Sequence, residues 1–449
     1  MKVRETKIVL CGGIRTPIGH MAKSLAAVSP EHLMTLTING LLGKTTLYPH
    51  AVDGVMVGWV GQGSHAPNIA RVSVLNSHLP EKAHAVTVQA NCVSGLEAIS
   101  SAARHILLEE GDVYIAGGTE SMSNFPYAIR GHRGMKELRS LDTVKANWHT
   151  LLDHGDISVV DCIEEGLNDP VKNLNMAATA EVCAQMYSID RVSQDAYAAE
   201  TYRRAFEAEE KGFYATHSIP VVENGATVLE KDEYPYLRES LVRKPEMLAK
   251  APVLFDSSGF TMKDFYQRYG EHILGKTYQP TSKASVTLFN SCARSDGAAA
   301  VIVTSEKRAR ELKLEILAEI VTWGYYGNNP AHMGIAPVFA TASALERAEL
   351  RFDDLDLIEL HEAFAATCLS IFKVGREKYK HHWESKWKEG KLNPNGGSIP
   401  LGHPLAATGT RIVLNALYQM KQRPEIRYAL ATACAAGGLG GAMILKRYS

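Results

Sequence analysis

Apolar positions follow two periods along this chain, one typical of short buried strands and one typical of helices. Residues 85–88 form a short, largely β-branched stretch. From Leu96 to Leu107, apolar side chains recur at the spacing of one helix face. A buried run at residues 112–116 completes a strand, a helix and a strand at the spacing of a βαβ unit. Strands are expected again at residues 355–360 and 428–433. The pattern predicts an α/β protein with parallel strands covered by helices.

The middle of the chain has a different character. From residue 123 to residue 283 it is rich in charged residues, tyrosine and histidine, with several predicted helices and few convincing strands. Ser193 is the expected N-cap of a helix that runs to about Lys211. This segment is predicted to be an inserted lid or oligomerisation domain. The expected division is an N-terminal domain, the insertion, a strand that returns to the N-terminal domain and a C-terminal domain, at residues 1–122, 123–283, 284–306 and 307–449.

Composition narrows the classes of function. Among 449 residues, 48 Lys and Arg nearly balance 49 Asp and Glu, so nothing indicates a globally basic nucleic-acid binder. The seven cysteines are scattered without CxxC spacing, which argues against a disulfide framework and a zinc site and indicates a reducing compartment. The chain shows no signal-peptide core and no apolar run of about 20 residues. We therefore expect a cytoplasmic protein without a metal, a nucleic-acid partner or a transmembrane segment.

Four side chains with acid, base or nucleophilic chemistry fall at strand ends or at the starts of the helices that follow. Cys92 is placed near a helix N-terminus, where unpaired N–H groups and the helix dipole favour a thiolate. His361, His403 and Cys434 occupy similar positions. In open α/β sheets, ligands collect at the carboxyl ends of strands. Each residue alone could be a small buried core residue, a helix cap or a loop residue. Cys92 alone is therefore a weak signal of catalysis.

Together the four residues form a set suited to acyl transfer. A thiolate can act as the nucleophile, an imidazole can deprotonate it, and a second thiol can move another proton. The glycine-rich turn after Cys434 lets backbone N–H groups approach a developing oxyanion closely. The joint interpretation as an active site is therefore favoured over four separate structural ones.

The motifs around these residues resemble those of thiolases, which cleave 3-ketoacyl-CoA with CoA or condense two acyl-CoA molecules. The resemblance extends in order over nearly the whole chain. It rests on blocks that begin near Arg15, Cys92, Gly117, Asn175, Asp296, Met333, His361, His403 and Cys434. It implies a thiolase-like fold of two related, layered α/β halves with an inserted, mostly helical loop domain.

The resemblance also implies a role for each residue. Cys92 would be the acylated nucleophile, His403 would activate it and bind the thioester oxygen of the second substrate, and Cys434 would be the acid or base at the substrate α-carbon. Backbone N–H groups of Cys92 and Ala436 would form an oxyanion hole. The expected substrate contacts are Ser291, Cys292, Met176, Ala363 and Phe364. Coenzyme A enters as a substrate, with no tightly bound cofactor.

Several positions depart from the usual thiolase pattern. His361 stands where most members have asparagine, a form similar to the thiolase subunits of fatty-acid β-oxidation complexes. The usual asparagine would hold a water in the first oxyanion hole, and His361 could hold that water or point inward itself. Bulky Leu288 and Phe289 replace small residues near the pantetheine. Residues 372–392 form a longer insert, which we interpret as a solvated helix, with a partner or membrane-surface contact as the alternative.

The favoured function is a degradative 3-ketoacyl-CoA thiolase acting on CoA thioesters in fatty-acid β-oxidation. Biosynthetic acetoacetyl-CoA thiolase is the alternative, and a 3-ketoacyl synthase is a more distant one that Cys434 and its glycine-rich turn disfavour. A non-catalytic acyl-CoA-binding scaffold subunit is disfavoured because all four polar groups are present. We expect a homodimer or homotetramer, and an enoyl-CoA hydratase/3-hydroxyacyl-CoA dehydrogenase partner is possible.

Overall fold

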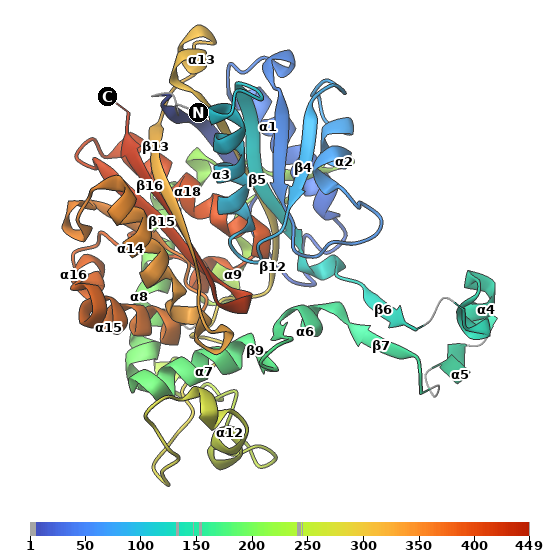
Figure 1. Ribbon diagram of the computed structural model, residues 1–449, viewed down its shortest axis with the longest axis vertical. Helices are drawn as coiled ribbons and strands as arrows, with labels where there is room; N and C mark the ends of the chain where they lie inside the picture. Colours follow the sequence, from blue (N-terminus) through green and yellow to red (C-terminus); the bar gives the residue numbers. More distant parts are fainter. Residues whose placement is uncertain are drawn as a thin grey trace.

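A mixed ten-stranded sheet organises the molecule (Figure 1). The computed structural model describes residues 6–131, 134–146, 148–151, 155–239, 244 and 246–448. The first half of the sheet contains β1 (Ile8–Arg15), β12 (Ser295–Ser305), β5 (Val113–Ser121), β3 (Gly54–Gly58) and β4 (His84–Val88), with β2 (Gly19–His20) paired to β12. The second half contains β13 (Ala318–Gly327), β16 (Leu439–Arg447), β15 (Tyr428–Ala435) and β14 (Leu357–Leu360).

The two halves follow the same path. In the first, β1 pairs antiparallel with β12, β12 pairs antiparallel with β5, and β5 pairs parallel with β3. In the second, β13 pairs antiparallel with β16, β16 pairs antiparallel with β15, and β15 pairs parallel with β14. The prediction of related α/β halves is confirmed. The sheet is mixed, however, because the last strand of each half turns back between two neighbours, whereas the sequence pattern indicated parallel strands only.

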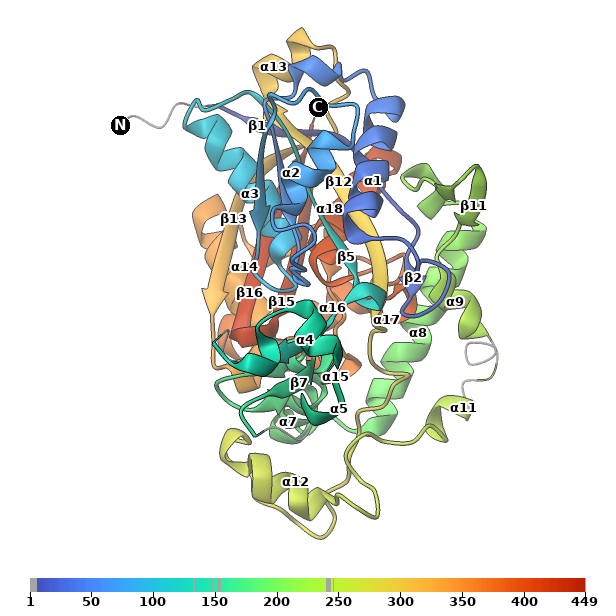
Figure 2. The same ribbon diagram turned by 90° about the vertical axis from the view of Figure 1, so that its right-hand side faces the viewer.

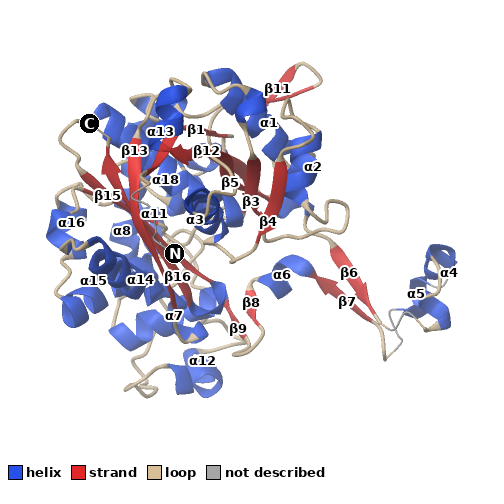
Figure 3. Ribbon diagram, turned by 45° about the horizontal axis from the view of Figure 1, so that its top comes forward, coloured by secondary structure: helices blue, strands red, loops and turns tan. Residues whose placement is uncertain are grey.

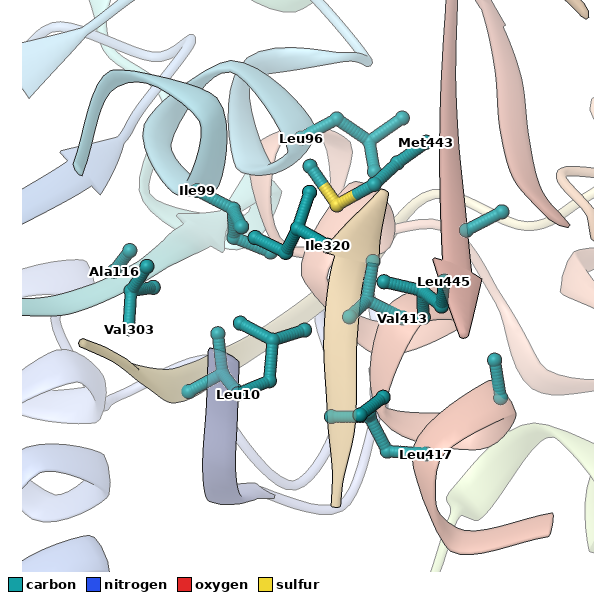
Figure 4. Packing of buried hydrophobic residues seen from close by; sticks show 14 of the residues in the cluster. Leu10, Leu96, Ile99, Ala116, Val303, Ile320, Val413, Leu417, Met443 and Leu445 are labelled. Atoms are coloured by element: carbon teal, nitrogen blue, oxygen red, sulfur yellow. The ribbon is translucent and has the colours of Figure 1, made fainter. Parts of the chain in front are cut away.

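Two helices form a layer between the halves. They are α3 (Ser94–Leu107) and α18 (Leu405–Gln422), and their apolar faces join residues of both halves of the sheet in one core (Figure 4). The helices approach very closely, since a Cβ added at Gly95 would lie 2.6 Å from the carbonyl oxygen of Ala406. Only glycine permits this spacing, and it brings the N-termini of the two helices together.

Further helices cover the outer faces of the sheet (Figure 3). Helices α1 (Pro30–Lys44) and α2 (Ile69–Leu75) pack against the first half, and α14 (Ala336–Ala348) and α15 (Ala365–Tyr379) against the second. Strands such as β12 are therefore buried along their whole length, which explains their run of small and β-branched residues. Among the described helices, none is long and apolar enough to cross a membrane.

The segment between β5 and β12 leaves the body in two excursions (Figures 1 and 2). The first is an arm made of the hairpin β6 (Tyr127–Arg130) and β7 (Ser158–Asp161), with α4 (Leu141–Ala146) and α5 (Trp148–Leu151) at its end. The second contains α12 (Met262–Tyr269). Between the two excursions the chain returns to the body through five helices of the described residues: α6 (Cys162–Gly166), α7 (Met176–Tyr187), α8 (Arg191–Glu210), α9 (Glu233–Leu237) and α11 (Glu246–Ala249). Two short strand pairs lie in the same region: β8 (Asn168–Asp169) with β9 (Leu174–Asn175), and β10 (Val221–Glu223) with β11 (Ala226–Leu229).

Two local predictions are corrected by the structure. Helix α8 begins at Arg191, because the side chain of Asp190 accepts a hydrogen bond from the backbone N–H of Ser193, so Asp190 and not Ser193 is the N-cap. The insert at residues 372–392 is solvated only in part: residues 376–380 are exposed, but the segment also has a buried face. It contains the end of α15 and α16 (Trp383–Lys388), in which Trp383 is fully buried and the Lys386 ammonium donates to the carbonyl oxygens of Asp353 and Leu355.

Candidate active site

Cys92, His361, His403 and Cys434 line one cavity of about 470 Å³. Cys92 lies two residues before α3, and His403 lies two residues before α18. His361 directly follows β14, and Cys434 is near the end of β15. The sequence predicted that these strand and helix ends lie close together. They do, at the point where α3 and α18 converge.

The predicted substrate contacts line the same cavity. Ser291 and Cys292 form part of its wall with Met176, Ala363 and Phe364. The backbone N–H of Cys292 donates to the carbonyl oxygen of Ala363, which fastens the segment before β12 to the loop after β14. The rest of the wall is mainly apolar and includes Leu288, whose side chain is exposed, so the bulk of this residue lies at the surface and not deep in the pocket.

The Cys92 thiol is uncharged in the free protein. Burial raises its pKa to about 11, although the backbone N–H of Ala436 donates toward the sulfur and opposes this effect. Proximity to the start of α3 does not therefore lower the pKa as the sequence argument expected, because desolvation outweighs the helix terminus. The contact places Ala436 N–H beside Cys92, and the Asn91 side chain holds this turn by donating to the Ala436 carbonyl oxygen.

His403 is arranged as a hydrogen-bond acceptor toward the cavity. Its Nδ1 lies 2.7 Å from Thr408 Oγ1, and this hydroxyl donates to the carbonyl oxygen of Pro404. The ring hydrogen therefore lies on Nδ1, and Nε2 carries a lone pair. Burial, assisted by the nearby Arg411 charge, lowers the pKa of His403 to about 3, so the ring is neutral.

His361 packs against His403, with the two ring centroids 4.1 Å apart. Its Nδ1 lies 2.7 Å from Ser398 Oγ. Burial, with contributions from His403 and Arg411, holds the pKa of His361 well below its usual range. Both imidazoles are consequently neutral, and neither can act as a resting positive charge beside Cys92.

Cys434 supplies the second thiol. Its side chain is buried, and desolvation together with the thiols of Cys92 and Cys292 raises its pKa well above the ordinary value. The chain then turns through Gly437 and Gly438, whose φ values of 76° and 77° favour glycine. This turn allows the backbone after Cys434 to approach the loop before α3.

Sequence reasoning missed the polar residues behind the two histidines. Thr408, Ser398 and Arg411 all lie within a few residues of the His403 motif, but their contacts depend on the fold. It also missed that Glu362 is a buried hub, which accepts hydrogen bonds from Tyr197, Thr201 and Asn393 and fixes the loop that carries His361. The adjacency of Glu362 to His361 was the one available signal.

Comparison with known families decides the classification. The model of the thiolase N-terminal domain matches residues 8–262, and that of the thiolase C-terminal domain matches residues 314–447. The chain belongs to the thiolase family. It is thus an acyltransferase, and the resemblance noted from its motifs is confirmed.

Known thiolases resemble the chain over nearly its full length. A probable acetyl-CoA acetyltransferase of Escherichia coli is 35% identical, covering 98% of this chain and 99% of its own, and a beta-ketothiolase of Cupriavidus necator is 35% identical with the same coverage. Human mitochondrial 3-ketoacyl-CoA thiolase, solved in complex with CoA, has a TM-score of 0.81 and 30% identity, covering 99% of this chain and 98% of its own.

Proposed function

We propose that this thiolase cleaves 3-ketoacyl-CoA with CoA, giving acetyl-CoA and a shortened acyl-CoA in fatty-acid β-oxidation. The observation that carries the proposal is the single cavity in which two thiols and two neutral imidazoles face a largely apolar wall. Its volume of about 470 Å³ and its apolar lining suit an acyl chain longer than acetyl. CoA is the proposed second substrate.

The first half-reaction forms an acyl-cysteine. His403 Nε2 takes the proton of the Cys92 thiol, and the sulfur attacks the 3-keto carbon of the substrate. The bond between C2 and C3 then breaks, and the Cys434 thiol gives its proton to C2, which releases acetyl-CoA. The remaining acyl group is held as a thioester on Cys92, with its oxygen near the N–H groups of Cys92 and Ala436.

The second half-reaction transfers the acyl group to CoA. After acetyl-CoA has left, the His403 imidazolium gives its proton to the Cys434 thiolate. His403 Nε2 then takes the proton of the incoming CoA thiol, and the CoA sulfur attacks the acyl carbon. The bond to Cys92 breaks, and the Cys92 sulfur recovers its proton from His403. Both thiols and the imidazole thus return to their uncharged resting forms, which are the forms that burial favours.

The biosynthetic direction is the second candidate, since several relatives are named acetyl-CoA acetyltransferases. Profiling thiolysis of 3-ketoacyl-CoA substrates from four to sixteen carbons separates the two candidates. Higher kcat/KM for the longer chains is expected for the proposed function. Activity restricted to acetoacetyl-CoA would instead favour the biosynthetic enzyme, and no turnover of any substrate would favour the scaffold.

Cys434→Ser tests the two-thiol mechanism itself. Acylation of Cys92 from acetyl-CoA requires no second thiol, whereas thiolysis and condensation move a proton at the α-carbon. A serine hydroxyl is far less acidic than a thiol of reference pKa about 8.5. We expect the variant to keep acetyl exchange between CoA thiols and to lose thiolysis by orders of magnitude. Parallel loss of both activities, or of neither, would show that Cys434 is not the α-carbon acid.

The proposal also includes a cytoplasmic location and assembly as a homodimer or homotetramer. The arm that carries α4 and α5 projects from the body of the molecule (Figure 1), and we propose it as the assembly surface. An enoyl-CoA hydratase/3-hydroxyacyl-CoA dehydrogenase partner would supply the 3-ketoacyl-CoA. Light scattering of the purified protein, alone and mixed with such an enzyme, tests both assemblies.

A further inference from the structure

His361 is the last member of a buried chain of three polar side chains. Arg411 Nη2 donates to Ser398 Oγ across 2.6 Å, and Ser398 Oγ lies 2.7 Å from His361 Nδ1. All three side chains are almost completely buried. The Nε and Nη1 groups of Arg411 have no partner among the described residues, so Ser398 Oγ is the acceptor that engages this guanidinium.

The positions of the hydrogens follow from what each group can donate. A guanidinium has N–H donors and no acceptor, so Ser398 Oγ must accept from Arg411. The serine hydroxyl has one hydrogen of its own. If His361 Nδ1 were protonated, that hydrogen would have no acceptor among the described residues, and an unmatched buried donor is unfavourable. Ser398 therefore donates to His361 Nδ1, and the ring hydrogen of the neutral imidazole lies on Nε2.

This arrangement is the opposite of that at His403, whose hydrogen lies on Nδ1. His361 Nε2 is buried without a partner among the described residues, and His361 lines the cavity with Cys92. We propose that Ser398, held by Arg411, is a positioning residue that fixes His361 in its Nε2–H tautomer. His361 then presents a donor to the substrate carbonyl oxygen, while His403 presents a base to the nucleophile.

The proposal explains how a histidine can occupy a position for which the motif resemblance implies an asparagine. An asparagine amide always offers N–H donors, whereas a neutral imidazole offers a donor at Nε2 only in one of two tautomers. In the other tautomer a lone pair would face the developing oxyanion and oppose the reaction. The hydroxyl of Ser398 removes this second state. The inference rests on the proposed function, because it assigns the donor to the same carbonyl chemistry.

Kinetics of Ser398→Ala test the inference. We expect kcat for thiolysis to fall at least tenfold with KM within about twofold of the original, because the interaction strengthens as charge develops on the oxygen. Ser370→Ala is the matched control, since Ser370 is an equally buried serine that donates only to a carbonyl within α15. In a His361→Ala background, Ser398→Ala should change the residual kcat by less than twofold.

Two kinetic outcomes would overturn the proposal. Ser398→Ala could retain normal kcat, or it could lower kcat as strongly in the His361→Ala background as in the original chain. The second outcome would show that Ser398 acts independently of His361.

NMR spectroscopy of the histidine rings tests this inference independently of the proposed function. In protein labelled with ¹⁵N-histidine, the pair of ring resonances lost in His361→Ala belongs to His361, and its Nδ1 should have the shift of an unprotonated nitrogen. In Ser398→Ala this pair should move toward mixed tautomers. A protonated Nδ1 in the original chain would refute the inference even if thiolysis is normal. An unprotonated Nδ1 would support it even if the preferred substrate proves to be different.

Discussion

A single methyl group at Gly118 should disturb the active site through the first turn of α18. Gly118 lies in β5, and a Cβ added there would be 2.1 Å from the carbonyl oxygen of Ala406. An ordinary contact is at least 3.4 Å, so the carbonyl must move by more than 1 Å. Ala406 is in the first turn of α18 and three residues after His403. We expect Gly118→Ala to displace His403 relative to Cys92.

The substitution should lower both the free energy of unfolding and the rate of thiolysis. Overpacking a close backbone contact of this kind costs about 1–3 kcal/mol of unfolding free energy. A misplacement of about 1 Å between reacting groups can lower the rate by about 10²-fold. Gly118→Ala should therefore remain largely folded at moderate temperature and still lose most of its kcat/KM for thiolysis.

Urea unfolding measures the change in stability, and steady-state thiolysis of the same preparations measures the change in kcat/KM. Gly43→Ala is the control, because Gly43 is exposed in α1 with no atom within 4 Å of the new Cβ, and alanine there should stabilise the helix by about 0.5–1 kcal/mol. Gly118→Ala with unchanged kcat/KM would refute the reasoning, because it would mean that α18 can move without moving His403.

The other predictions concern the nucleophile, its base and the anchor of α9. Brief exposure to acetyl-CoA should place an acetyl group on Cys92 by mass spectrometry, and a label found mainly on Cys434 would contradict the assignment. His403→Ala removes the proposed base, so thiolysis should fall by about 10²-fold or more, and near-normal turnover would exclude this role. Asp232→Asn should cost about 3–5 kcal/mol in urea unfolding, because Arg15 and Asp232 form a buried bidentate pair. Breaking the exposed Arg130–Glu165 pair with Glu165→Gln should change stability little, and equal effects would show that burial is not what matters.

The elements that deliver the four reactive side chains were predictable from the sequence because their signals are local. The short β-branched run before Cys92 corresponds to β4, and the apolar spacing after it corresponds to α3, which ends at Leu107 as the pattern indicates. The reversal of β12 and β16 was not predictable, since a buried strand has the same composition whichever direction it runs. The N-cap of α8 was misplaced by three residues, because both Asp190 and Ser193 are good capping residues.

The parts that could not be predicted depend on contacts between distant segments. The sequence around Lys386 and Trp383 resembles a solvated amphipathic stretch. The backbone carbonyl oxygens of Asp353 and Leu355 nevertheless accept hydrogen bonds from the Lys386 ammonium and allow it to be buried. The tautomers of His361 and His403 likewise depend on Ser398 and Thr408. Motif spacing identifies which residues meet, but the hydrogen on each ring is decided by the donor or acceptor that packs behind it.

The raised pKa of Cys92 is consistent with a nucleophile once the whole cavity is considered. Of the described residues that line it, none is Asp or Glu, and the N-termini of α3 and α18 both converge on it. Burial therefore keeps the thiols and imidazoles neutral at rest, while the aligned N–H groups favour negative charge that appears on sulfur or on the substrate oxygen. Charge separation is thus disfavoured until a substrate carbonyl is present to receive the thiolate. A site built in this way limits unproductive reactions of a free thiolate, and its donors need little rearrangement when the reaction begins.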